Sequence, residues 1–337
     1  MSTFGNLTTT TTIAPYIPTS RPVQFSILLT IAIFSLPCSI FVLHHFLSTK
    51  TLYRAANNHV IILLLISNCL QTLTDVPGQL SYYILGVNRP LTLSYCYYFY
   101  FIDFYLFTTC FLLLTWSSFE RHILIFHIYV FNTHRKRVAY HYIPLMICVT
   151  YPMIYYVYFI FFYPCENYYD EYTSYCVPAC YLRTNAMMAL YEQIAHGFAL
   201  MLLIFIFNVL LFIRVVQQKA RMGRQMTWKK NRKMAVQLFS MCFLFLLTNG
   251  GYFVVQIGQM LYDPTFGVEF SLWAIPVAMC MPPLFPFVCL STLDELHGKL
   301  KRATPCWNRW AVVPITGTEL QHLPTTTSRR RDYLKNG

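Results

Sequence analysis

Long apolar runs separated by short polar intervals dominate the chain of 337 residues, and 56% of its residues are hydrophobic. A helix needs about 20 mostly apolar residues to cross a bilayer, and seven runs reach that length. The predicted membrane-spanning helices are 23–47, 59–85, 92–126, 138–163, 187–217, 234–260 and 268–292. The pattern therefore predicts an all-α membrane protein, a seven-transmembrane helix bundle.

The predicted bundle occupies residues 23–292, with a polar segment on either side. Residues 1–22 lack the apolar core of a cleavable signal sequence, so the first helix is expected to serve as an uncleaved insertion signal. Residues 305–337 are expected to form a mostly disordered tail.

The basic residues orient the bundle, because Lys and Arg collect on the cytoplasmic side of membrane proteins. Of the 25 Lys and Arg residues, 22 fall in four intervals: 48–58, 121–137, 214–233 and 293–337. The other three are Arg21, Arg89 and Arg183. We therefore predict an N-terminus outside and a C-terminus inside. The formal net charge of +12 then faces anionic membrane lipids, and nucleic acid is not an expected partner.

Four of the twelve cysteines lie on the predicted outer side, which is oxidising: Cys96, Cys165, Cys176 and Cys180. Four cysteines allow three pairings, and the sequence does not choose between them. We favour Cys96 joined to Cys176 or Cys180, with Cys165 closing a smaller loop.

Two positions in the terminal segments are candidates for modification. Asn6 begins the glycosylation sequon Asn6-Leu7-Thr8 on the predicted outer side. Cys306 follows Lys301 and Arg302 just beyond the last helix, where a palmitoyl chain could anchor the tail. An unmodified tail and an unmodified thiol are the alternatives.

The third predicted helix, 92–126, carries charged residues near both ends. Asp103 and Arg121 are 18 residues apart, which places them on one helical face, separated by about 27 Å of rise. Glu120 directly precedes Arg121. Because charges within a membrane are costly unless they face the bundle interior or a watery cavity, both ends are candidate functional sites. The alternative for Arg121 is anchoring at the lipid headgroups.

Spacings on three helices extend this pattern. Arg121 follows Cys96 by 25 residues, and Pro286 precedes the amphipathic stretch STLDELHGKLKR. On the second helix the spaced residues are Asn58, Asn68 and Pro77. In these motifs the chain resembles a divergent member of the rhodopsin-like G-protein-coupled receptors, over roughly residues 23–306.

The resemblance implies a multi-pass receptor of the plasma membrane. Such a receptor binds an extracellular small-molecule or peptide ligand among the outer halves of its helices and activates a heterotrimeric G-protein through a cytoplasmic cavity. The residues to which it assigns coupling or switching are Glu120, Arg121, Asn68 and Pro286. It also implies a short amphipathic eighth helix over 293–304. No cofactor is expected.

The chain departs from the family pattern at two of these positions. Asn68 stands where the family usually has a sodium-binding aspartate, and the Asn-Pro-x-x-Tyr signature reads Phe285-Pro286-Phe287-Val288-Cys289. The chain therefore lacks the side chains that the family uses for sodium binding and for this part of its switch.

Asp103 matches the position at which amine receptors of the family hold an acid for a cationic ligand. Asp75 on the second helix could present a second carboxylate to the same pocket, and Phe107 lies one turn beyond Asp103. Glu192 and His196, one turn apart on the fifth helix, are candidate additional lining, and a packed, neutral histidine is the alternative for His196. One hypothesis for the ligand is therefore a cationic amine or peptide. In the alternative, neighbouring polar residues hydrogen-bond these acids as structural groups.

Other function classes fit the sequence less well. The histidines lie at scattered depths without a metal-binding spacing on one helical face, so neither a metal site nor a membrane enzyme is expected. A seven-helix ligand-gated cation channel or transporter, with Asp75 and Asp103 on the ion path, is the alternative function.

Overall fold

The computed structural model describes six ranges: 21–86, 92–126, 133–167, 179–221, 225–263 and 265–292. Several predictions concern residues outside these ranges, namely Asn6, Cys176, Cys306, the eighth helix 293–304 and the tail 305–337.

Helices make up nearly all of the described residues, and these ranges contain no strand. Spans one to three are α1 (Arg21–Ser48), α3 (Ala56–Leu85) and α4 (Leu93–Phe126). Span four comprises α5 (His134–Arg137), π-helical η2 (Val138–Tyr142), α6 (Ile143–Val157) and π-helical η3 (Tyr158–Phe162). Span five comprises α8 (Ala186–Tyr191), π-helical η4 (Glu192–Phe198) and α9 (Ala199–Arg221). Span six is α10 (Gln225–Leu261), and span seven is the pair α11 (Val268–Met279) and α12 (Met281–Thr292). Two short helices, α2 (Lys50–Tyr53) and α7 (Cys180–Thr184), lie between spans.

Six of these spans are long and apolar enough to cross a membrane, and the bent pair in span seven supplies the seventh. The prediction of a seven-helix bundle is confirmed. The two halves of span seven meet at an angle of 48°. The bend has a local cause, because Pro282 and Pro283 have no N–H to donate to the carbonyls of the preceding turn.

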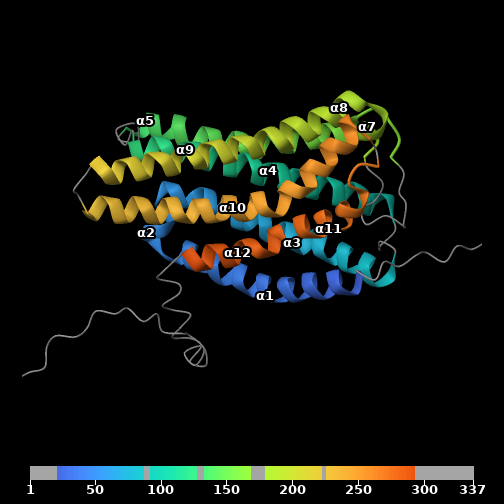
Figure 1. Cartoon of the computed structure of the whole chain (residues 1–337), viewed down its shortest axis with the longest axis horizontal. Coiled ribbons are helices and arrows are strands. Elements are labelled where there is room, and N and C mark those ends of the chain that lie inside the picture. The colour runs from blue at the N-terminus through green and yellow to red at the C-terminus, as the bar shows by residue number, and fades with distance from the viewer. Residues whose placement is uncertain are drawn as a thin grey trace, which may run out of the picture. The chain divides into compact units, whose positions relative to one another are not determined.

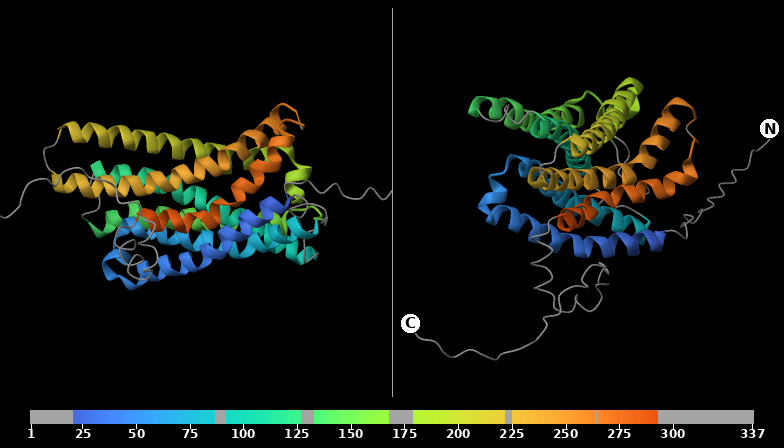
Figure 2. Two further views of the ribbon diagram at one scale, coloured as in Figure 1. Left: turned by 60° about the horizontal axis from the view of Figure 1, so that its bottom comes forward. Right: turned by 60° about the vertical axis from the view of Figure 1, so that its left-hand side comes forward.

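Span three lies at the centre of the bundle, where α4 contacts α3, α6, α9 and α10 (Figures 1 and 2). Around it, α1 packs on α3 and α12, and α10 packs on α11 and α12. Phe111 and Leu114 of α4 and Phe245 of α10 are fully buried in the resulting core. Large apolar side chains such as Phe34 and Ile154 remain exposed on the outside, as a surface in contact with lipid requires.

The two ends of the bundle are named here by the charge-based prediction of orientation. The outer end is the one at which α4 begins, and the inner end is the one at which Arg121 lies.

Candidate functional site

A cavity of about 370 Å³ lies among the outer halves of the spans. Span three contributes Tyr100, Asp103, Phe104 and Phe107. These positions recur at three- and four-residue intervals, so a single face of α4 forms this wall. The rest of the lining comes from spans five, six and seven and from α7: Leu182, Ala189, Gln193, Asn249, Tyr252, Gln256, Met260, Ile275, Ala278 and Met279.

Among the described residues that line the cavity, Asp103 is the one acid, and a second acid lies behind it. Gln71 Nε2 donates a hydrogen bond of 3.0 Å to Asp103 Oδ1, and the Asp75 carboxyl is a close electrostatic neighbour of Asp103. Thr74 Oγ1 donates to Asp75 Oδ1 at 3.0 Å, while the buried Asp75 Oδ2 accepts no hydrogen bond. Among the described residues neither carboxyl has a Lys or Arg partner. The pair therefore keeps capacity for a donor or a cation.

Below Phe107, aromatic rings close the core between the two ends of the bundle. The ring centroids of Phe107 and Phe111 are 4.7 Å apart, and Phe111 lies 4.2 Å from Phe245 and 5.5 Å from Phe253. Gly197 of η4 permits this packing, since a Cβ there would lie 2.1 Å from a carbon of Phe253. A side chain at Gly197 would therefore displace the Phe253 ring or the two spans.

Glu192 and His196 do not line the cavity. Both are buried where η4 meets spans three and four, and the His196 Nδ1 atom lies 3.2 Å from Glu192 Oε1. Tyr156 of α6 donates its hydroxyl proton to Glu192, and its oxygen lies 2.8 Å from Thr108 Oγ1 of α4. Tyr151 bonds the other side of the His196 ring at 2.8 Å. These polar groups join three spans, whereas Gln193, the next residue of η4, is the one that reaches the cavity.

At the inner end, Glu120 and Arg121 are each only 1% exposed. Glu120 Oε1 lies 2.5 Å from His141 Nδ1 of η2, and His141 Nε2 lies 2.9 Å from His59 Nδ1 of α3. The other ring nitrogen of His59 donates to the Tyr53 carbonyl at 2.9 Å. Glu120 thus begins a chain of hydrogen bonds that crosses spans three, four and two.

Sequence reasoning missed His59 and His141 as partners of Glu120. A signal was present: both histidines lie within the first four residues of predicted spans, 59–85 and 138–163, at the same membrane depth as Glu120. Within the described residues, no group of three His, Cys, Asp or Glu side chains has a geometry that could hold a metal ion.

The two remaining switch candidates are buried in the bundle. Asn68 Nδ2 donates to the Leu64 carbonyl at 2.7 Å and lies 3.7 Å from Cys110 Sγ of α4. Pro286 lies inside α12, beside the fully buried Phe285. Asn68 therefore links spans two and three in the middle of the membrane.

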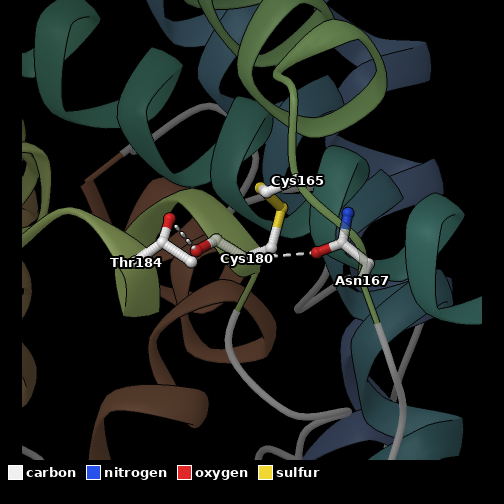
Figure 3. Close-up of a disulfide and its surroundings, with 4 residues drawn as sticks. All are labelled: Cys165, Asn167, Cys180 and Thr184. Carbon is white, nitrogen blue, oxygen red and sulfur yellow. Dashed lines mark hydrogen bonds between the residues drawn. A yellow bond between two sulfur atoms is a disulfide. The ribbon is translucent and has the colours of Figure 1, made fainter.

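A disulfide joins Cys165, after span four, to Cys180, the first residue of α7, with 6.0 Å between their Cα atoms (Figure 3). Asn167 Oδ1 accepts from the Cys180 N–H at 2.6 Å, and Thr184 Oγ1 donates to the Cys180 carbonyl at 2.8 Å. Because Cys180 pairs with Cys165, it cannot be the partner of Cys96, as one of the two favoured pairings had it. Cys96 is itself disulfide-bonded. The expected smaller loop closed by Cys165 is present.

Comparisons with known proteins agree with this architecture. The family model described as 7 transmembrane receptor (rhodopsin family) matches residues 38–288. The crystal structure of squid rhodopsin superposes with a TM-score of 0.64 at 16% sequence identity, covering 86% of this chain and 87% of the rhodopsin chain. No curated protein sequence matches significantly. Proteins of this family are multi-pass receptors, typically of the plasma membrane, and are not enzymes. Since the family model matches about three quarters of its residues, the chain belongs to the rhodopsin family of seven-transmembrane receptors.

Proposed function

We propose that this receptor binds an extracellular ligand in the outer cavity and activates a heterotrimeric G-protein through its inner end, at Arg121. One observation carries the proposal: a single unbroken helix, α4, contributes Asp103 to the cavity wall and holds Arg121 at its other end. Any shift of α4 on ligand binding would therefore displace residues both at the outer cavity and at Arg121. Membership of a receptor family favours this function over a channel or transporter.

The ligand that suits the cavity best is a cationic amine or a peptide that presents a cationic group. Asp103 supplies a buried carboxyl, with Asp75 behind it and no Lys or Arg partner in the described residues. Tyr100, Phe104 and Tyr252 surround the same space with aromatic rings, whose faces attract cations. A ligand cation would offset the loss of hydration that these acids undergo on burial.

Binding would act by favouring one of two arrangements of the helices. Span six is the element proposed to move, because Gly250 and Gly251 weaken α10 next to the cavity residues Asn249 and Tyr252. A Cβ at Gly250 would meet no atom within 4 Å, so this side of the helix has room to shift. At the inner end, movement of α10 would uncover Arg121, which lies beside Cys242 of that helix.

The test is a ligand screen on intact cells with a promiscuous G-protein readout, using amines, cationic peptides and neutral isosteres of each. We expect cationic ligands to signal and their neutral isosteres to be inactive. If all active ligands are neutral or anionic, the role of Asp103 is wrong. Solute flux that follows ligand activity without any G-protein would overturn the receptor mechanism.

The orientation is tested separately with an N-terminal epitope tag. Antibody should label intact cells if the N-terminus is outside, as the distribution of Lys and Arg predicts. Labelling that requires permeabilised cells would reverse the two ends of the bundle and exclude the proposal.

A further inference from the structure

The hydrogen-bond chain at the inner end has three links. Glu120 contacts His141 at 2.5 Å, His141 contacts His59 at 2.9 Å, and His59 contacts the Tyr53 carbonyl at 2.9 Å. Of the three side chains, Glu120 and His141 are almost fully buried. Water therefore has little access to replace the first link.

Counting protons along this chain gives its charge state. Each hydrogen bond uses one proton, and a carbonyl oxygen can only accept, so His59 Nε2 carries a proton toward Tyr53. If Glu120 is ionised and both rings are neutral, the rings supply two protons for three bonds. The neutral His141 ring has one N–H, which can donate to Glu120 or to His59 but not to both.

The full chain therefore requires one additional proton, carried on either ring or on the carboxyl. With that proton bound, one positive ring balances the Glu120 carboxylate, or all three groups are neutral. Without it, two lone pairs face one another either between Glu120 and His141 or between His141 and His59, and that contact is repulsive.

We propose that Glu120, His141 and His59 bind one shared proton and form a proton latch across the inner ends of spans two, three and four. The latch joins three helices and the segment that ends α2, so its assembly holds these inner ends together. Loss of the shared proton removes one link and loosens them.

Other charged or titratable groups lie against the latch. The Arg121 guanidinium interacts electrostatically with Glu120, and Arg137 precedes His141 by one turn along span four. The Tyr142 ring contacts both histidine rings, with centroids 4.9 and 5.9 Å away, and the Tyr53 ring lies 6.2 Å from His59. Arginine and tyrosine side chains ordinarily keep their protons at neutral pH, so the proton count of the latch itself is what changes.

The sign of the pH dependence follows from the count. Separated from one another, the acid is ionised and the histidines are mostly neutral above about pH 6.5. The assembled latch holds one more proton than the separated groups, so falling pH favours assembly and rising pH favours release. If the inner end couples to a G-protein, as in the proposed function on which this step rests, alkaline cytosol would raise ligand-independent signalling.

The experiment uses the full chain in nanodiscs and follows the thermal unfolding midpoint between about pH 6 and pH 9. The informative variant is Glu120→Gln, because its amide can donate to His141 Nδ1 and complete all three links without an extra proton. His59→Phe keeps a ring against Tyr142 but removes two links. His44→Gln is the matched control, since His44 is exposed at the same end of the bundle and its ring bonds Ser48 on its own helix.

We expect the midpoint of the unmodified chain and of His44→Gln to fall as pH rises, by an amount equivalent to one released proton. Both Glu120→Gln and His59→Phe should lose this dependence, Glu120→Gln with a high midpoint throughout and His59→Phe with a low one. Parallel pH profiles in all four proteins would overturn the latch. If Glu120→Gln cannot be purified, the comparison of His59→Phe with His44→Gln decides.

Nucleotide exchange by an added G-protein, measured on the same samples without ligand, separates this inference from the proposed function. A pH profile altered by the variants in a receptor that never stimulates exchange would keep the latch and remove the coupling. Exchange with unaltered pH profiles would do the reverse.

Discussion

A buried acid lies near each end of α4, and the two acids differ in the partners that surround them. Asp103 accepts one bond from a neutral amide, faces a cavity and has a second acid beside it. Glu120 is held at 2.5 Å by a histidine that is itself bonded to another histidine. Since a buried carboxyl without compensation is costly, the outer acid is suited to receive a charge from outside the protein. The inner acid already receives its compensation from within the protein, which suits a switch better than a binding site.

The two ends are separated by the buried aromatic rings below Phe107, and substitutions there are expected to have the largest effect on stability. Replacing Phe111 by Ala removes a fully buried ring in contact with Phe107, Phe245 and Phe253. We expect a loss of about 3 to 5 kcal/mol in the free energy of unfolding, measured by thermal denaturation in nanodiscs. Phe243→Ala, which removes a ring exposed to lipid, is the control and should cost far less. Equal losses would mean that Phe111 is not a core residue.

At the outer end, Asp103→Asn should reduce the potency of a cationic agonist roughly 100-fold, since it removes one partner of a buried charge pair. Asp75→Asn is the comparison variant and should have a smaller effect, because Asp75 does not line the cavity. Dose–response curves for a cationic ligand and its neutral isostere measure both. Identical losses for the two ligands would show that Asp103 has only a structural role.

At the inner end, Arg121→Ala should reduce G-protein activation by roughly 10-fold, equivalent to about 1.4 kcal/mol of coupling free energy, while surface expression stays intact. The reason is that Arg121 is proposed to meet the G-protein once α10 moves. Nucleotide exchange per receptor at the surface is the measurement. Unchanged exchange would leave Arg121 with only a structural role in the buried inner end and remove the functional contrast between the two ends.

The smallest effect is expected away from both ends, at the polar cluster around η4. Tyr156→Phe removes the hydroxyl that donates to Glu192 and should cost about 1 kcal/mol of stability. Agonist potency should be almost unchanged, because neither Tyr156 nor Glu192 lines the cavity. Tyr158→Phe, at a half-exposed position on the same span, is the control for stability. A large loss of potency in Tyr156→Phe would place this cluster in the ligand site after all.

The fold was predictable because hydrophobic length and the position of basic residues are properties of the sequence alone. The predicted segment 92–126 differs by one residue from α4 (Leu93–Phe126), and 59–85 lies within α3 (Ala56–Leu85). The interruption of span seven at Cys280 is one feature that the apolar pattern does not show, and it follows from the prolines after it. The orientation stays a prediction.

The candidate site was predictable only where one helix determines it. Asp103 and Phe107 share a face of α4 by their spacing, so both reach the cavity. The direction in which Glu192 and His196 point depends on the π-helical stretch η4 and on the tyrosines of span four, which helical periodicity does not reveal. Contacts between helices, such as those of the proton latch, need the relative rotation and depth of three spans at once.

The cross-link between Cys165 and Cys180 has a practical consequence for all of these measurements. Leu182, two residues after Cys180, forms part of the cavity wall, so the disulfide helps to fix one side of the outer cavity. The seven spans could insert and pack in a host that keeps thiols reduced, and such material would pass tests of helix content while its pocket lacked a fixed rim. Receptor for ligand studies should therefore be produced through an oxidising secretory route, and reductant should be kept out of the binding buffer.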